Sequence, residues 1–318
     1  MGSKEPLNEL LRFQHETEAL MSVAGRLGWD RETMMPHGSS VQRATEQAAL
    51  VRVIHDRNTD PRIADWLDKF SPRNEKEKAS KRLIQKNYEK ACRVPTELNA
   101  TIAEVTSRAH GIWATARQNE QASDFLPILD EIVKLKIEKA EALAKRGNRY
   151  DALIDQYEPN ISADEISVMF QKLRPTLVGL RKEILNKQKP KAIVGIFGEE
   201  VQLKLAKELA AAFGYDFNRG RIDKAVHPFS SGSGNDVRIT TRTDPSDPFN
   251  CVYSTIHEVG HAIYEQNIEQ EYMFSPLGHG VSLGVHESQS RICENQLGRS
   301  RPFTGWLFHR MQELFGDF

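Results

Sequence analysis

The sequence predicts a mainly α fold, in which a multi-helix body carries one small β element. Two observations support this prediction. Apolar residues recur at helical spacing from about residue 5 to residue 215. A single run, residues 237–242, alternates between the two faces of a strand and is rich in β-branched side chains. We therefore expect a helical protein with a small hairpin or sheet.

Breaks in the apolar pattern delimit the first helices. Leu10, Phe13 and Leu20 lie on one face of a first helix, which we expect to end near residues 28–30. Met34, Met35 and Pro36 separate it from the next. Further helices are expected over about residues 39–55, 60–70, 73–92 and 95–118, and from about residue 123 onward.

A long helix is expected after Ser162. Ser162 with Glu165 has the spacing of a capping box, and Pro175 should kink the helix that follows. The basic segment 186–191 contains Pro190 and is either a loop or a hinge, of which we favour the loop.

The segment His257-Glu258-Val259-Gly260-His261 indicates chemistry. On a helix, His257 and His261 lie one turn apart on one face, so both imidazoles can bind one Zn²⁺. Glu258 points about 100° round the helix, where a general base of an HExxH metallopeptidase lies. The alternative is an amphipathic helix with two packed histidines, but the apolar surroundings make unpaired imidazoles costly.

A third ligand can be sought by elimination. Tyr264 and Asn267 occupy the positions where the metzincin pattern needs Gly and His. Glu265 would lie about 12 Å along the axis from His257, too far for one ion. A second helix is expected around residues 286–295, and Gly278, Gly280 and Gly284 let the chain turn back before it. Glu287 on this helix is the predicted third ligand; a surface ion pair with Arg291 is the alternative.

The strand at residues 237–242 precedes this helix. An edge strand there could pair with an extended substrate backbone, whereas the alternative is a structural hairpin. Arg238 and Arg242 point to the same side of the strand. They can meet a substrate carboxylate or form a salt bridge with a helix carboxylate, and the sequence leaves both open.

Composition excludes several classes of partner. The net charge is −1, so no bulk field recruits nucleic acid or an anionic membrane. The three cysteines are far apart and show no CxxC spacing, which favours a reduced compartment. We find neither a signal peptide nor a run of about 18 apolar residues. We expect a soluble, cytoplasmic protein that binds neither nucleic acid nor membrane.

The motifs together resemble a known family. The runs HEVGHAIYEQ and HESQSRICENQLGRS, the upstream segment HPFSSGSGNDVRITTR with its following DPF, and more weakly LGWDRETMMPHG, are similar to the carboxypeptidase Taq family of zinc metallocarboxypeptidases. The resemblance implies His257, His261 and Glu287 as zinc ligands and Glu258 as catalytic base. It also implies peptide substrates, a homodimer, and a helical body split by a long narrow groove, with residues 1–120 as its lid and 121–318 as the body.

The expected mechanism is Glu258-assisted attack of a zinc-bound water on the scissile carbonyl. Each histidine ligand should donate its other N–H to a nearby oxygen, for which Asp247 and Glu294 are candidates. Surface roles are the alternative for both. Two histidines and a glutamate also accommodate Co²⁺.

Family members are longer and carry two later motifs, IRxxAD and GxxQDxHW, which this sequence lacks. The resemblance implies that the part of the family's chain with these two motifs binds the C-terminal carboxylate of the substrate. We expect the chain to be the N-terminal portion of a longer enzyme. Three functions remain open: a carboxypeptidase of broad specificity, an endo-acting oligopeptidase with the same zinc core, and an inactive metal-binding helical module.

Overall fold

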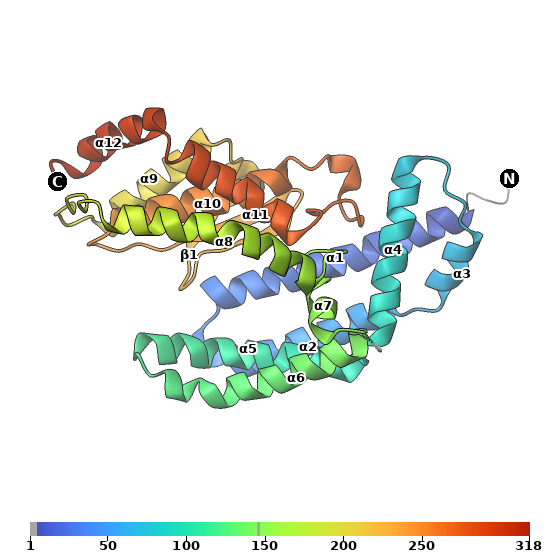
Figure 1. Cartoon of the computed structure of the whole chain (residues 1–318). Helices are drawn as coiled ribbons and strands as arrows, with labels where there is room; N and C mark the ends of the chain where they lie inside the picture. The colour runs from blue at the N-terminus through green and yellow to red at the C-terminus, as the bar shows by residue number, and fades with distance from the viewer. Residues whose placement is uncertain (1–4, 145–146) are drawn as a thin grey trace.

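The computed structural model describes residues 5–144 and 147–318, and it confirms the mainly helical prediction. An N-terminal layer of helices packs against a C-terminal layer of helices that also contains a small sheet (Figure 1). Among the described helices, none has the length and the apolar content needed to cross a lipid bilayer.

The N-terminal layer begins with a long helix. Its helices are α1 (Glu5–Thr33), α2 (Ser40–Asn58), α3 (Arg62–Lys69), α4 (Glu75–Arg93), α5 (Thr96–Gln118) and α6 (Leu126–Ala144). Leu10, Ile63 and Ile84 join α1, α3 and α4 in one core, while Val105 and Ile128 join α5 to α6. The lid expected over residues 1–120 thus packs against α6 as well, and its residues 1–4 lie outside the described part.

Helix α1 continues past its predicted end near residues 28–30 to Thr33. A helical glycine such as Gly28 costs only about 1 kcal/mol relative to alanine. The indole of Trp29 is buried, and its burial offsets that cost. The glycine was therefore a weaker stop signal than the sequence suggested.

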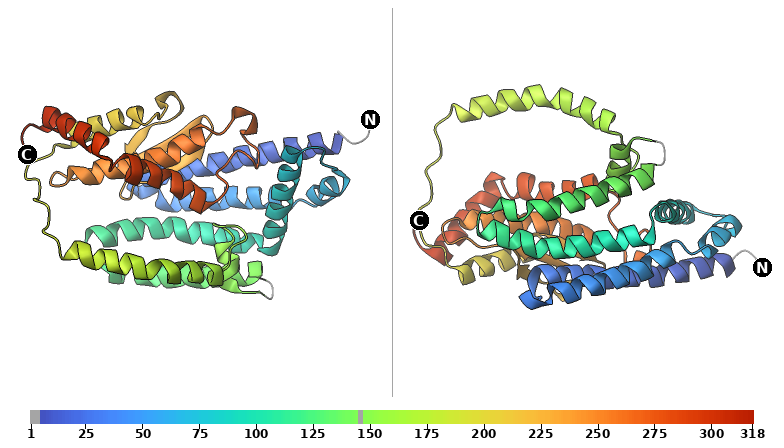
Figure 2. Two further views of the ribbon diagram at one scale, coloured as in Figure 1. Left: turned by 45° about the horizontal axis from the view of Figure 1, so that its top comes forward. Right: turned by 90° about the horizontal axis from the view of Figure 1, so that it is seen from below.

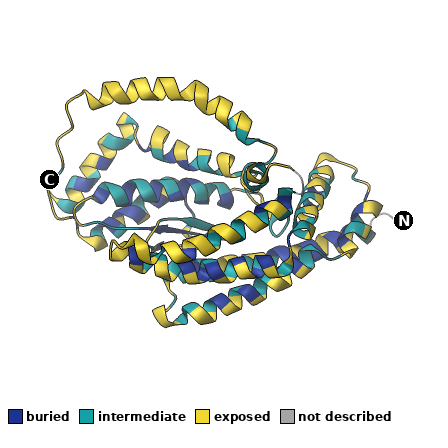
Figure 3. Ribbon diagram, turned by 60° about the horizontal axis from the view of Figure 1, so that its bottom comes forward, coloured by how far each residue is buried: buried dark blue, intermediate teal, exposed yellow. Residues whose placement is uncertain are grey.

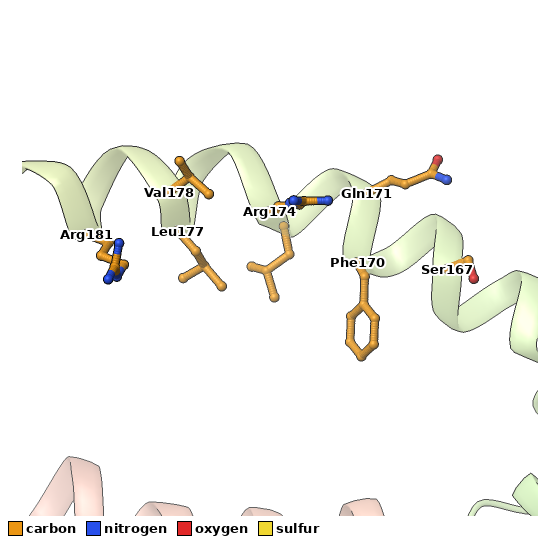
Figure 4. Close-up of a pocket in the computed structure, with 8 residues that line it drawn as sticks. Ser167, Phe170, Gln171, Arg174, Leu177, Val178 and Arg181 are labelled. Atoms are coloured by element: carbon orange, nitrogen blue, oxygen red, sulfur yellow. The ribbon is translucent and has the colours of Figure 1, made fainter.

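Helix α8 (Ala163–Leu185) follows the short α7 (Arg149–Ile154) and stands apart from the two layers (Figure 2, right). The predicted capping box is present, because Ser162 and Glu165 bond each other's backbone N–H groups. The helix runs unbroken through Pro175. None of its side chains is buried (Figure 3), and apolar Phe170 and Leu177 project from one side (Figure 4).

The C-terminal layer contains the sheet and the remaining helices. These elements are α9 (Glu199–Ala212), β1 (Ile222–Lys224), β2 (Ser230–Ser233), β3 (Asp236–Thr241), α10 (Pro248–Gln266), α11 (Leu283–Arg291) and α12 (Arg301–Phe315). The segment 186–198 that leads into α9 is an irregular loop, as expected. Ile256 of α10 packs with Leu209 of α9 and Met311 of α12, so α10 forms the centre of the layer.

The strand predicted at residues 237–242 is β3, and of the two alternatives left open for it, the edge strand is wrong. β3 lies in the middle of the sheet, parallel to β1 and antiparallel to β2. A tight turn at Gly234, whose φ is 61°, returns β2 to β3. Within β2, Gly232 has φ 95°, and a Cβ on it would lie 1.9 Å from the carbonyl oxygen of Asp236. The hairpin reading is correct, and the edge beside β3 belongs to β2.

Helix α1 lies against this sheet through charged contacts. The guanidinium of Arg26 lies 3.7 Å from the carboxylate of Asp236. The guanidinium of Arg238 lies 4.4 Å from the centre of the Trp29 ring. Glu18 of α1 meets His279, in the loop between α10 and α11, at 2.9 Å. The N-terminal layer is therefore fixed to the part of the molecule that contains the HExxH segment.

Candidate metal centre

Helix α10 begins with a capped turn. The carboxylate of Asp247 accepts a hydrogen bond from the backbone N–H of Phe249 at 3.0 Å, and Pro248 occupies the first helical position. His257 lies ten positions after Asp247, about 15 Å along a helix. Asp247 caps the helix, and its predicted role as a hydrogen-bond partner of a histidine ligand is wrong.

Two histidines and one carboxylate converge where α10 packs against α11. The histidines lie one turn apart on α10, and the carboxylate belongs to α11. The Nε2 atoms of His257 and His261 lie 3.6 Å and 3.3 Å from the same carboxylate oxygen of Glu287. The ligand atoms of the three residues all lie within 4.8 Å of one another. Donors of a tetrahedral ion with bonds of about 2.0–2.1 Å are roughly 3.3 Å apart, so these residues fit a divalent metal.

Gly260 permits this convergence. A Cβ on Gly260 would lie 2.5 Å from the Cα of Ser290 and 2.8 Å from the carbonyl oxygen of Gln289. Any larger residue would push α11 away from α10. Because Gly260 lies between the two histidines and Ser290 is one turn from Glu287, the close approach of the two backbones brings the carboxylate to the imidazoles.

The protonation of these groups suits metal binding. Burial and the neighbouring His286 and His257 lower the pKa of His261 to about 4, so it is neutral at pH 7. Burial alone would raise the pKa of Glu287, but the hydrogen bond from Arg291 and the adjacent histidines give a net lowering. The site offers a free imidazole and an ionised carboxylate, so protons compete little with a metal ion.

Glu258 lies beside the convergent residues without joining them. Its side chain is buried and lines a pocket of about 630 Å³ together with His261 and residues of the loop before α11. Burial, and secondarily the charge of Glu287, raise the pKa of Glu258 to about 8. A cation between the histidines would oppose this shift and favour the carboxylate.

The metal-free protein should lose stability as pH rises. Unfolded Glu258 ionises near 4.5, whereas folded Glu258 keeps its proton up to about pH 8. The raised pKa therefore stabilises the fold below 4.5, and this contribution is lost between the two values at about 1.4 kcal/mol per pH unit. Glu258→Gln should remove this dependence. In urea unfolding with a chelator, the variant should gain a few kcal/mol over the wild type between about pH 5 and 8. If the free energies of unfolding of the variant and the wild type changed in parallel with pH, the raised pKa of Glu258 would be contradicted.

The outer nitrogens of the two histidines have different partners. The Nδ1–H of His257 donates to Glu294 at 2.9 Å, as the sequence predicted, and Arg291 and Arg299 hold the same carboxylate at 3.1 Å. Nδ1 of His261 instead lies 2.6 Å from Nδ1 of His286. Sequence reasoning missed His286, although its place next to Glu287 was a signal for a position near the ligands.

Arg238 and Arg242 lie away from the convergent residues. Arg238 donates to Asp236 of its own strand at 2.7 Å, and Arg242 donates to the side chain of Asn250 at 2.7 Å. The structural alternative therefore describes both better than substrate binding, although neither partner is a helix carboxylate, since Asp236 lies on a strand and Asn250 is an amide. Arg242 also lines a different pocket from the one that contains Glu258.

Comparison with known proteins decides the family. The model of the family described as Carboxypeptidase Taq (M32) metallopeptidase matches residues 9–318. This chain belongs to that family.

Its relatives include curated proteins and solved structures. Thermostable carboxypeptidase 1 of Thermus thermophilus is 40% identical and is matched by 100% of this chain, which covers 66% of that protein. The M32 carboxypeptidase of Deinococcus radiodurans superposes with a TM-score of 0.86 at 33% identity, over 98% of this chain and 64% of that one. Trypanosoma cruzi metallocarboxypeptidase 1 superposes with a TM-score of 0.85 at 30% identity, over 99% of this chain and 65% of that one. The chain thus spans about two thirds of the length of these M32 relatives.

Proposed function

We propose that this protein acts as a zinc-dependent metallocarboxypeptidase that removes single amino acids from peptide C-termini with broad specificity. The observation that supports this most directly is the convergence of His257, His261 and Glu287 beside buried Glu258, in a chain of the M32 family. In this proposal the first three residues hold the metal, and Glu258 is the general base.

The residues divide the chemistry between them. His257, His261 and Glu287 would hold a divalent ion, which would supply a Lewis acid for the scissile carbonyl and would acidify the attacking water. Glu258 takes the proton of that water and passes it to the leaving amine. Glu294 fixes the ring of His257 through Nδ1. Zinc is the proposed ion, and Co²⁺ is the alternative that the same donor set accepts.

The choice of peptide end tests the function. The zinc-loaded chain should release the last amino acid of a free-acid peptide and leave the same peptide untouched when its C-terminus is amidated. Internal cleavage of both peptides would support the endo-acting oligopeptidase instead. Bound zinc without any cleavage, in a chain that covers 66% of its Thermus relative, would support the inactive metal-binding module.

The proposal also covers the lid over the substrate groove, the oligomeric state and the cellular location. We propose the N-terminal layer, including α6, as the lid of a substrate groove, and a homodimer as the assembly. The exposed apolar side chains of α8, among them Phe170 and Leu177, support association with another polypeptide. Sedimentation should give twice the mass of one chain. The free thiols of Cys92, Cys251 and Cys293 support a cytoplasmic location.

A further inference from the structure

A line of hydrogen bonds leads from His261 into the protein. Nδ1 of His261 lies 2.6 Å from Nδ1 of His286, and Nε2 of His286 lies 2.9 Å from Oε1 of Glu265. Glu265 is buried in α10, one turn beyond His261. His257 differs, because its outer nitrogen meets a carboxylate directly.

The hydrogen bonds determine where each proton lies. A carboxylate is a hydrogen-bond acceptor, so the N–H at Nε2 of His286 satisfies the 2.9 Å contact to Glu265. Nδ1 of His286 is then the acceptor for the N–H at Nδ1 of His261, which lies 2.6 Å away. This arrangement leaves His261 with a bare Nε2, the atom that faces Glu287 at 3.3 Å.

We propose that Glu265 and His286 are positioning residues that fix His261 in the tautomer whose Nε2 binds the metal. This inference rests on the proposed metal site, and it assigns a purpose to two residues that line the pocket beside Glu258. His286 acts through His261, and Glu265 acts through His286; neither belongs to the three convergent ligands.

The surroundings hold the relay in place. The ring of His286 lies nearly parallel to that of His261, with centroids 4.7 Å apart, and meets the ring of Tyr264 edge-on at 5.3 Å. The backbone N–H of Gly280 donates to Oε1 of Glu265 at 3.2 Å. A Cβ on Gly280 would lie 2.7 Å from Cδ2 of His286, so only glycine leaves room for this ring.

Burial shows that the carboxylate has a specific task. Within the described residues, Oε2 of Glu265 is buried without any hydrogen-bond partner. Leaving a buried polar atom unpaired costs free energy, and an apolar residue would avoid that cost. An acceptor that cannot donate is what the relay requires at this position, since a donor there would reverse both hydrogen bonds.

Glu265→Met tests the proposal, because its side chain has about the length of glutamate and offers no carboxylate acceptor to His286. Without that acceptor, the proton of His286 is no longer held at Nε2, and His261 is no longer fixed in one tautomer. We expect the zinc Kd, measured by competition with a chelator, to rise about 10- to 100-fold. Glu269→Gln removes the same charge from an exposed position after α10 and should leave the Kd unchanged.

A second pair of variants separates positioning from packing. His286→Phe keeps a ring but no hydrogen bonds and should weaken zinc binding as Glu265→Met does. His286→Gln can accept from His261 and donate to Glu265 at once, so it should restore most of the affinity. Equal losses in both His286 variants would point to packing alone and overturn the relay.

The tautomer can be observed without metal. In the metal-free protein at neutral pH, ¹⁵N NMR of labelled histidines should show His261 protonated at Nδ1 and bare at Nε2, with mixed tautomers in Glu265→Met. The His261 signals are assigned by their loss in His261→Asn. A wild-type His261 protonated at Nε2, or one unaffected by Glu265→Met, would overturn the relay. Failure of the wild type to bind zinc, with this tautomer present, would instead count against the proposed function.

Discussion

Glu258→Gln should lower kcat/KM for release of a C-terminal amino acid by about 10²–10⁴-fold, the range over which general-base catalysis contributes. The amide has the size of the carboxylate but cannot take a proton from water at neutral pH. Glu258 is not among the convergent ligands, so the variant should bind zinc with the affinity of the wild type. Activity and metal content, measured on the same preparation, check both halves of this result.

The matched control is Glu269→Gln, which changes an exposed residue and should keep full activity. Retained activity in Glu258→Gln would show that another group accepts the proton. Loss of zinc together with activity would show that Glu258 helps to hold the ion, contrary to its assignment here.

Glu287→Ala should raise the Kd for zinc at least about 10²-fold. Structural zinc sites bind with roughly 10–16 kcal/mol, so one ligand of four contributes about 3 kcal/mol, or at least about 10²-fold in Kd. The two histidines would remain, together with Arg291, which would lose the 2.7 Å contact to Glu287 and keep the one to Glu294 at 3.1 Å. Zinc titration monitored by calorimetry gives the Kd directly.

Glu269→Ala is the control here, and its zinc Kd should equal that of the wild type. An unchanged Kd in Glu287→Ala would show that the third ligand lies elsewhere. Taken together, the variants at positions 258 and 287 distinguish loss of the base from loss of a metal ligand, because only the second should raise the Kd for zinc.

The part of the site that lies on a single helix could be predicted from the sequence. The spacing of His257 and His261 follows from helical geometry alone. The prediction of Glu287 as a ligand required a turn between two helices, and Gly278, Gly280 and Gly284 indicated that turn. The helical layers were predictable for the same reason, since each apolar face repeats within its own segment.

Long-range pairing explains most of what was missed. β2 has the sequence SSGS, which lacks β-branched residues, and it is a strand only because β3 lies beside it. Arg242 lies just beyond the end of β3, so only Arg238 is on the strand, and the partners of both depend on neighbouring residues and, for Arg238, on α1. The relay through His286 depends on how the loop between α10 and α11 closes, which no local spacing encodes.

Asp247 illustrates a different limit. Asp before Pro at the start of an apolar helix is an N-cap signal, and this local explanation was sufficient. Glu294 lies in a π-helical turn, Ile292–Leu297, that follows α11. A regular α-helix would place Glu294 on nearly the same face as the π-helical turn does. The predicted contact between Glu294 and a histidine was therefore confirmed even though the local geometry differs.

The most direct test of the metal site is X-ray diffraction from zinc-soaked crystals, recorded on both sides of the zinc absorption edge. We predict one anomalous peak between Nε2 of His257, Nε2 of His261 and the carboxylate of Glu287, at about 2.0–2.2 Å from each. A peak bound to other residues, or no peak in crystals whose zinc exceeds the protein, would contradict the assignment of these three ligands.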